Sequence, residues 1–216
     1  AALPDASTVF FLAGRKFGTG DSPETLALYN EEMPALVAER YAGASIVALS
    51  TGCVYPFVAP DSGGSTEEDE VGPVGDYAVS CLGRETAFRR ASEKNGSPLA
   101  LIRLNYSVDL RYGVLVDLAR KVIRGEEIDL TTGYFNCIWQ GDAIRCTIRA
   151  LDHAAPVPDP FLLNVSGTRI LGVRDTALLF EELLNRPARL VGTESATAWL
   201  SNTDKSQRLF GPPSVP

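Results

Sequence analysis

The sequence has a single histidine, His153, and its four cysteines form no Cys-x-x-Cys pair. One imidazole and scattered thiols cannot supply the ligand set of a typical zinc site, so ligand supply alone disfavours metal catalysis. The cysteines are expected to be reduced structural residues of a cytoplasmic protein. They are Cys53, Cys81, Cys137 and Cys146.

Long apolar runs and an excess of basic residues are missing as well. No stretch approaches the ~20 residues of a membrane-spanning helix, and no basic segment followed by an apolar core indicates a signal peptide. The 20 Lys and Arg against 27 Asp and Glu give a net charge of −7, so no broad basic face can bind a phosphate backbone. We therefore expect neither a membrane nor a nucleic acid as partner.

The composition that is present, 45% hydrophobic and 22% charged over 216 residues, is typical of a folded chain with one sizeable core. Its first half alternates short apolar runs with helical segments. The pattern predicts strands over 8–13, 45–50 and 98–104, and helices over 23–41 and 77–94. Uninterrupted apolar strands that alternate with helices indicate an α/β fold with a parallel sheet covered on both faces.

The second half is less regular and is expected to form a small mixed region from residue 111 to 216, after a first region of residues 1–110. A long surface loop is expected over 56–73, and a loosely ordered tail from Ser201. The remaining predicted elements are helices over 114–123, 143–151 and 173–184, and strands over 135–140 and 161–165.

Three polar segments coincide with the ends of predicted elements. The segment Ser50-Thr51-Gly-Cys-Val-Tyr55 ends the second strand, Tyr77-Ala-Val-Ser-Cys81 opens a helix, and Arg103-Leu-Asn-Tyr-Ser107 closes the third strand. Ligands of open α/β sheets bind beyond the carboxyl ends of the strands. The three segments together therefore predict a ligand site.

These segments resemble the extended short-chain dehydrogenase/reductase family, the NAD-dependent epimerases and dehydratases. That family has a Ser/Thr-x-x-x-Tyr strand end and, ~25 residues later, a helix that begins with Tyr-x-x-x-Lys. Further similar segments are Leu12 to Gly18 and Ile138 to Ala143, so the resemblance covers nearly the whole chain. It implies a doubly wound, Rossmann-like parallel sheet whose residues 1–110 belong to a dinucleotide-binding domain, with a substrate-binding region over 111–216.

The resemblance also implies roles for particular residues. Tyr77 would be the general acid/base and Thr51 would hydrogen-bond the same substrate oxygen. The implied cofactor, NAD or NADP, would contact Leu12, Ala13, Gly14, Lys16, Asn30, Ser50 and Asn105. The implied substrate, a nucleotide sugar or related hydroxyl or carbonyl compound, would contact Tyr106, Tyr112, Trp139 and Gln140. A homodimer is the family's usual assembly.

The lysine of the family's helix motif is absent, because its position is occupied by Cys81. A phenol titrates near ~10, and a cation ~4 Å away lowers its pKa by about three units at an effective dielectric of ~20. An active Tyr77 therefore needs another cation, and Lys16 and Arg103 are the candidates. Two alternatives stay open: an impaired dinucleotide-binding or sensing protein, and Cys81 as a nucleophile, although no histidine base is nearby.

The glycine-rich phosphate-binding fingerprint of the family is also missing ahead of Thr8. The resemblance would place about 70 to 90 residues, with the first strands of the sheet, before Ala1. The chain is thus expected to match the carboxyl-terminal two-thirds of such a protein. Alone, it would expose the Thr8 strand as a sheet edge and bind a dinucleotide weakly, and a purely structural or interaction role is a third alternative.

Overall fold

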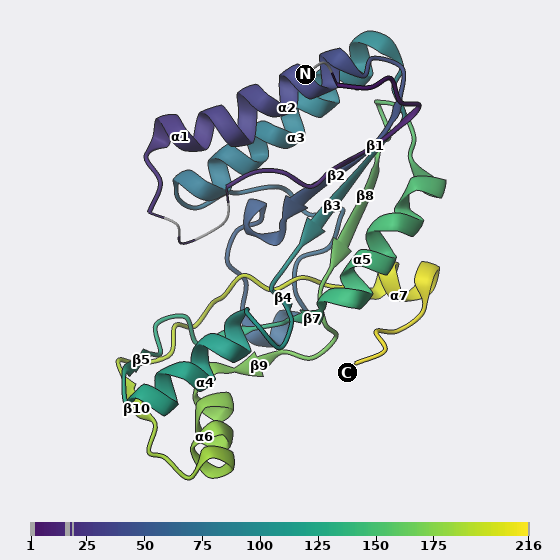
Figure 1. Cartoon of the computed structure of the whole chain (residues 1–216). Coiled ribbons are helices and arrows are strands. Elements are labelled where there is room, and N and C mark those ends of the chain that lie inside the picture. The colour runs from purple at the N-terminus through teal and green to yellow at the C-terminus, as the bar shows by residue number, and fades with distance from the viewer. Residues whose placement is uncertain (1–2, 16–17, 19, 216) are drawn as a thin grey trace. The chain divides into compact units, whose positions relative to one another are not determined.

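The computed structural model describes residues 3–15, 18 and 20–215 (Figure 1). The chain forms two compact units, each assembled from segments that are distant in sequence. The first unit comprises residues 1–56, 70–104 and 145–163, and the second comprises 57–69, 105–144 and 164–216. The division into a dinucleotide-binding region (1–110) and a substrate-binding region (111–216) concerns ligand binding and stays a prediction.

A four-stranded sheet with the order β1-β2-β3-β8 is the centre of the first unit (Figure 1). β1 pairs with β2 in parallel, β2 pairs with β3 in parallel, and β1 stands at one end of the strand order. The middle strands are buried on both faces, as their apolar sequences predict. The bounds are β1 Thr8–Phe11, β2 Ser45–Thr51, β3 Leu99–Leu104 and β8 Phe161–Val165.

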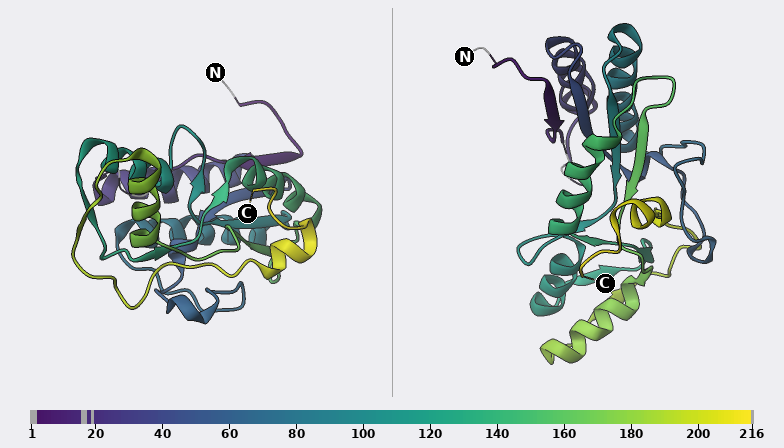
Figure 2. Two further views of the ribbon diagram at one scale, coloured as in Figure 1. Left: turned by 90° about the horizontal axis from the view of Figure 1, so that it is seen from below. Right: turned by 90° about the vertical axis from the view of Figure 1, so that its right-hand side faces the viewer.

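Helices cover this sheet on both faces. On one face α2 and α3 lie side by side (Figure 2), and Ala38 and Phe88 from these helices pack against Phe11, Ile46 and Leu101 of the strands. On the other face the turn η4 contacts β2 and β3. The expected α/β class and Rossmann-like layering are therefore confirmed. The bounds are α1 Pro23–Ala27, η1 Leu28–Glu32, α2 Met33–Arg40, η2 Gly52–Val54, α3 Asp76–Asn95, α5 Gln140–Arg149 and η4 Ala150–His153.

The helix expected over 23–41 is interrupted by one π-helical turn, η1. The N–H of Met33 bonds to the carbonyl of Leu28 in the wider π pattern. Pro34 follows directly, has no N–H to donate, and its ring would collide with the carbonyl of Asn30 in a regular α-helix. The wider turn relieves this collision, and it leaves Asn30 fully buried.

The second unit has its own apolar core between α4 and α6. Leu118 and Val122 of α4 pack with Ile128, Phe135 and Ala177, which gives the amphipathic helices a buried face. The bounds are β4 Ser107–Val108, α4 Val114–Arg124, β5 Glu127–Asp129, β6 Tyr134–Phe135, β7 Ile138–Trp139, β9 Leu171–Gly172, α6 Val173–Leu184, β10 Arg189–Val191, α7 Asp204–Phe210 and the short η3 Pro60–Ser62.

Three predictions about the second half are wrong, and Asn136 explains part of two of them. The strand expected over 135–140 is two short strands, because the buried side chain of Asn136 binds backbone carbonyls between them. The helix that follows begins at Gln140 rather than Ala143. The tail from Ser201 is ordered: Ser201 N donates to Asn136 Oδ1 at 3.3 Å, and α7 buries Phe210.

The loop expected over 56–73 is held to the second unit at several points. Val58 forms a β-bridge with Ala198, and Ser65 forms one with Ser201. Asn164 donates from Nδ2 to the Ser65 carbonyl at 2.8 Å. Long-range pairing of this kind leaves no local pattern in the sequence, so composition alone predicted only a surface loop.

Replacement of Phe88 by alanine should destabilise the first unit by about 3–5 kcal/mol, because Phe88 is 1% exposed and stacks edge-on against Phe11 with ring centroids 5.1 Å apart. Urea unfolding followed by circular dichroism measures the change. Leu183→Ala, at a side chain 68% exposed, is the control and should change little. Equal effects of the two substitutions would contradict this packing.

Candidate active site

The end of β2 presents Thr51 at the start of a tight 3-10 turn. Thr51 is the N-cap of η2, and its Oγ1 accepts a hydrogen bond from Cys53 N at 3.2 Å. The Cys53 thiol also bonds to the Thr51 side chain. The hydroxyl of Thr51 is therefore fixed at the carboxyl end of the strand, where α/β sheets bind ligands.

Tyr77 lies in the first turn of α3, which begins at Asp76 after Gly75 in the left-handed region (φ 85°). The ring is half-buried against Val54 and Tyr55, the residues that follow Thr51. Tyr77 also interacts with the thiols of Cys53 and Cys81. Thr51 and Tyr77 thus both neighbour Cys53, and their shared role in catalysis remains a prediction.

Burial raises the pKa of the Tyr77 phenol well above its ordinary value, and the Cys81 and Cys53 thiols raise it further. One group acts in the opposite direction: the guanidinium of Arg84 lowers the pKa of Tyr77. Arg84 follows Tyr77 by seven residues and Cys81 by three, which places it on the same face of α3. Arg84 was not among the residues predicted from the sequence, because the helical spacing gives its face but only tertiary contacts show that it is buried.

The cysteines beside Tyr77 are poor nucleophiles. Burial raises the pKa of Cys53 to about 11 and also raises that of Cys81. Both thiols are therefore protonated near neutral pH, whereas nucleophilic attack needs the thiolate. The alternative in which Cys81 is a nucleophile loses its chemical basis.

Asn30 joins the end of β1 to the start of α3. Its Oδ1 accepts from Arg15 N at 3.0 Å and from the Arg84 guanidinium, and its Nδ2 donates to Ser80 Oγ at 2.9 Å. Ser80 in turn donates to the Tyr77 carbonyl at 2.8 Å. The amide therefore uses its bonds within the protein, and the predicted cofactor contact of Asn30 stays a prediction.

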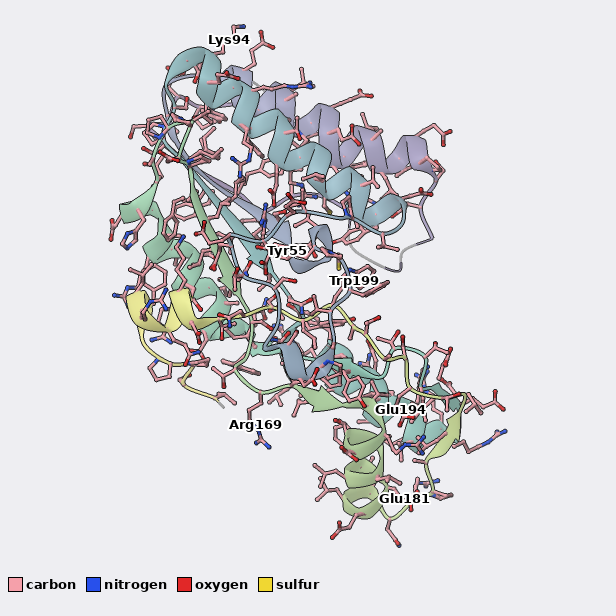
Figure 3. All side chains as sticks on the ribbon, turned by 180° about the vertical axis from the view of Figure 1, so that it is seen from behind. Tyr55, Lys94, Arg169, Glu181, Glu194 and Trp199 are labelled. Carbon is pink, nitrogen blue, oxygen red and sulfur yellow. The ribbon has the colours of Figure 1, made fainter. Side chains whose placement is uncertain are left out.

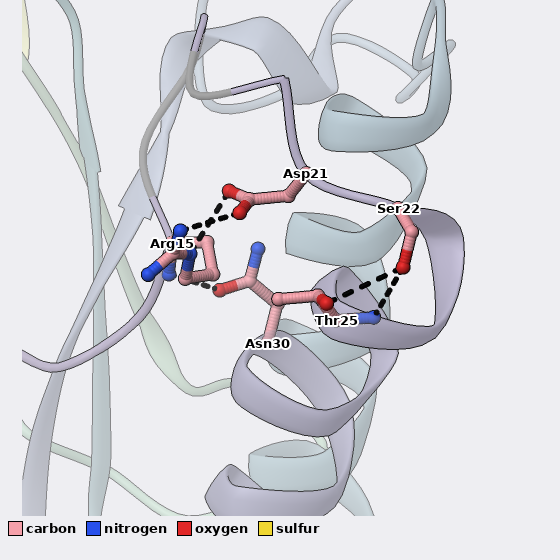
Figure 4. Close-up of polar contacts among 5 residues, drawn as sticks. All are labelled: Arg15, Asp21, Ser22, Thr25 and Asn30. Carbon is pink, nitrogen blue, oxygen red and sulfur yellow. Dashed lines mark hydrogen bonds and ion pairs between the residues drawn. The ribbon is translucent and has the colours of Figure 1, made fainter.

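The loop after β1 is closed by an ion pair between Arg15 and Asp21 (Figure 4). Arg15 Nε donates to Asp21 Oδ2 at 2.9 Å. Next to this pair, Ser22 Oγ caps α1 by accepting from Thr25 N at 3.3 Å. The ion pair thus joins Arg15 to Asp21, and the Ser22 cap marks the start of α1.

A second polar network is buried between α3 and the carboxyl ends of β2 and β3. Arg103 of β3 pairs with Glu85 of α3 through two hydrogen bonds, Nε to Oε1 at 2.9 Å and Nη2 to Oε2 at 2.8 Å. Arg103 Nη1 donates to the Tyr55 hydroxyl at 2.7 Å, and Ser50 Oγ donates to Glu85 Oε1 at 2.7 Å. Tyr55 is labelled in Figure 3.

Burial alone would lower the pKa of Arg103, but its hydrogen bond to Glu85 and the charge of Glu85 raise it above the ordinary value. Its guanidinium is committed to this pair and is not among the groups that act on Tyr77. The expectation that Arg103 supplies the cation is therefore corrected in favour of Arg84. The other candidate, Lys16, lies outside the described residues.

The remaining predicted residues of the first unit differ in accessibility. Leu12, Ala13 and Gly14 are exposed beyond β1, where a ligand can reach their backbone. Ser50 is buried and bonded to Glu85. The cofactor roles of all four stay predictions.

In the second unit, Asn105 Nδ2 donates to Asn136 Oδ1 at 2.9 Å and to the Trp199 carbonyl at 3.2 Å. Tyr106 has a positive φ of 42° and its ring lies 6.0 Å from that of Phe135. The other predicted substrate residues are surface residues whose roles stay predictions: Tyr112 is 42% exposed, and Trp139 and Gln140 are half-buried.

Within residues 3–15, 18 and 20–215, no group of three His, Cys, Asp or Glu side chains is placed to hold a metal ion. In the same part of the chain, every helix is too short or too polar to cross a bilayer.

No protein-family model and no curated protein matches the sequence. Solved structures do match. The chain superposes on UDP-glucuronic acid 4-epimerase from Bacillus cereus in complex with NAD, with a TM-score of 0.80 and 18% identity, over 98% of this chain and 70% of that one. It also matches UDP-glucose 4-epimerase from Thermotoga maritima (TM-score 0.76, 17% identity, 97% and 73% coverage).

A crystal structure of UDP-galactose 4-epimerase is a third neighbour, with a TM-score of 0.75 and 19% identity over 98% of this chain and 73% of that one. At identities below one in five, such likenesses establish architecture and leave activity open. The expected resemblance to the NAD-dependent epimerases is thus confirmed at the level of the fold, which this chain shares with the UDP-sugar 4-epimerases.

Removal of the buried guanidinium by Arg103→Met should cost about 3–5 kcal/mol of stability, because Glu85 would be left buried without its partner. The side chains of Arg103 and Glu85 are 4% and 1% exposed. The double variant Arg103→Met/Glu85→Leu should recover much of that loss, because it removes both charges. Urea unfolding of the two variants gives the comparison.

The control is Arg189→Met, which breaks the pair with Glu127 in which both side chains are more than half exposed. It should change the unfolding midpoint little, since exposed pairs contribute little. A double variant less stable than Arg103→Met alone would contradict the assignment of the loss to an unpaired carboxylate.

Proposed function

We propose that this protein is an NAD(P)-dependent epimerase, dehydratase or reductase that acts on a nucleotide sugar, with UDP-hexose 4-epimerisation as the leading reaction. The observation that carries the proposal is the arrangement around Cys53: a strand-end threonine, Thr51, and the helix-opening phenol of Tyr77, with a buried guanidinium on the same helix. This arrangement pairs a hydrogen-bonding hydroxyl with an acid/base whose pKa a nearby cation lowers.

The solved structures with the same fold support the substrate class. Their names specify UDP-glucuronic acid, UDP-glucose and UDP-galactose epimerases, and the Bacillus cereus enzyme was crystallised with NAD. The four cysteines are free thiols, as expected for a protein of a reducing compartment such as the cytoplasm.

The residues after β1 fit the nicotinamide end of a dinucleotide. Leu12, Ala13 and Gly14 leave their backbone exposed, and Arg84 lies so close to Gly14 that a Cβ there would come within 2.1 Å of Arg84 Nη2. The glycine-rich loop that would hold the pyrophosphate has no counterpart in the 216 residues. When bound, the nicotinamide supplies the hydride acceptor and donor.

The residues of the chain supply the proton chemistry. Tyr77 takes the proton of the sugar hydroxyl as that carbon is oxidised, and returns it when the carbonyl is reduced from the opposite face. Thr51 hydrogen-bonds the same oxygen and orients it. Because the pKa of Tyr77 is raised by burial, the positive charge of Arg84 is needed for the phenol to act as a base.

The test is turnover of UDP-glucose, UDP-galactose and UDP-glucuronic acid in the presence of NAD, followed by chromatographic separation of the epimers. Tyr77→Phe should lower kcat at least 100-fold, because it removes the proton acceptor. Tyr41→Phe, at the C-cap of α2, is the matched control and should keep activity.

NAD binding by calorimetry separates the outcomes. Binding without turnover of any sugar would favour a dinucleotide-sensing protein of the same fold. Turnover that Tyr77→Phe leaves unchanged would contradict the role of the phenol. Because the 216 residues lack the glycine-rich loop, the titration extends to millimolar NAD. Absence of both binding and turnover at that concentration would contradict the proposed function for this chain.

We also propose that the protein is a homodimer that pairs through α2 and α3. These helices border a groove of about 720 Å³, lined by small residues and by two charged sets. Glu31, Glu32 and Glu39 lie on the η1–α2 side, and Arg90 and Lys94 lie on the α3 side. In a twofold assembly the acidic side of each copy faces the basic side of the other. Lys94 is labelled in Figure 3.

Ala35→Arg should convert the dimer to a monomer, because Ala35 is an exposed small residue of α2 in this groove. Light scattering after size-exclusion chromatography measures the mass. Ala196→Arg, an exposed alanine of the second unit, should leave the mass unchanged. A wild-type protein that is monomeric at micromolar concentration would contradict the dimer.

A further inference from the structure

The guanidinium of Arg84 is an unusual buried charge. Arg84 is 6% exposed, and its guanidinium donates to two neutral oxygens: Nη1 donates to the Leu49 carbonyl at 2.8 Å, and Nη2 donates to Asn30 Oδ1. Its Nε has no hydrogen-bond partner among the described residues. A buried cation is costly to keep without an opposite charge, so a chain that retains one needs a compensating use for it.

We propose that Arg84 supplies to Tyr77 the positive charge that the resembled family takes from a lysine at the position occupied here by Cys81. Arg84 acts through Tyr77 and is therefore a positioning residue for the proton transfer. The inference rests on the proposed function for its biological use, whereas the electrostatic effect on the phenol can be measured without turnover.

The geometry of α3 makes this substitution possible. Positions 77, 81 and 84 follow one another at four and three residues, so their side chains lie along one helix face. The cation has moved one turn further from the phenol than the motif lysine. Arginine has the longer reach and cannot be deprotonated at working pH, so burial does not abolish its charge.

The space for this guanidinium is provided by Gly14. A Cβ at Gly14 would come within 2.1 Å of Arg84 Nη2 and 2.8 Å of Asn30 Oδ1. Gly14 also has a positive φ of 146°, a conformation that side chains disfavour. The end of β1 and the Asn30 amide thus surround the Arg84 guanidinium, and Asn30 is the buried residue of the π-helical turn η1.

The other ionisable groups around the phenol cannot supply the charge. Cys53 and Cys81 are thiols whose pKa values are raised by burial, and both act to raise the pKa of Tyr77. Glu85 pairs with Arg103, and Arg15 pairs with Asp21. Glu31 lies against Gly83 on the neighbouring turn of α3. Within the described residues, Arg84 is the cation that lowers the pKa of the phenol.

Cys81 itself fits the inference. The thiol is fully buried with Val54 and Tyr55, and Asn30 Nδ2 lies 3.9 Å from its Sγ. A lysine at position 81 would place an ammonium, a second cation, beside the Arg84 guanidinium in a low-dielectric environment, where like charges repel strongly. One cation, at position 81 or at position 84, is enough to lower the pKa of Tyr77, and cations at both positions would repel each other.

The experiment incorporates 3,5-difluorotyrosine at position 77 of the 216-residue chain and follows its ionisation by ¹⁹F NMR. Fluorination brings the titration of the phenol into a range in which the protein stays folded. Arg84→Gln keeps hydrogen-bond donors but removes the charge, and it should raise the pKa of the fluorinated residue by about one to two units. Arg84→Lys should restore most of the difference.

Two further variants test the exchange of positions. Cys81→Lys/Arg84→Gln should return the pKa to within about half a unit of the parent, because the cation again lies on the same helix face. Arg124→Gln removes an exposed charge from α4 and should leave the pKa unchanged. Circular dichroism confirms that each variant is folded.

A pKa that responds equally to Arg84→Gln and Arg124→Gln would overturn the inference. If Arg84→Gln does not fold, Arg84→Met/Asn30→Leu takes its place, because it removes the guanidinium together with the amide that accepts its hydrogen bond. It should likewise raise the pKa by about one to two units, and an unchanged pKa would contradict the inference. A pKa shift without any sugar turnover would instead contradict the proposed function and leave the role of Arg84 standing.

Discussion

The bidentate pair between Glu85 and Arg103 is the interaction on which the geometry of the first unit depends. It joins the middle of α3 to the end of β3, and the hydrogen bond from Ser50 brings the end of β2 to the same carboxylate. A helix tied in this way to two neighbouring strands cannot slide along the sheet. Its first turn, with Tyr77, therefore stays at the level of the strand end that presents Thr51, and the position of the phenol is set by a buried network rather than by the loops.

In the proposed arrangement, the positive charge that lowers the pKa of Tyr77 comes from a residue other than the lysine of the family's helix motif. A lysine four residues after the tyrosine is one solution, and a buried arginine seven residues after it is another on the same helix face. The buried arginine needs two further features around it: a glycine, which has no side chain, after β1, and an amide from η1 that accepts its hydrogen bond. The surroundings of Arg84 thus come from three elements, the end of β1, η1 and α3, none of which is read by a comparison of the motif position alone.

The sequence predicted the parallel sheet and its helices well because apolar strands and capped helices are local patterns. It also located Thr51 and Tyr77 at the ends of adjoining elements. It did not predict Arg84, because a charged residue inside a helix is usually exposed to solvent. Only the tertiary positions of Gly14 and Asn30 show that Arg84 is buried. The second half was harder, since Asn136 replaces strand pairing with side-chain hydrogen bonds to distant backbone, and α7 is ordered by such contacts rather than by its own periodicity.

The π-helical turn between α1 and α2 has a consequence for how this surface can change over time. One extra residue in a helical turn rotates everything beyond it by about 100° relative to a regular helix. The inserted residue therefore changes which side of the helix faces the protein interior. Asn30 is buried, whereas Ala35, in the next turn, is exposed. Substitutions at exposed positions of α2 can therefore accumulate without disturbing the buried Asn30 amide, whereas deletion of one residue from η1 would change the direction of both faces at once.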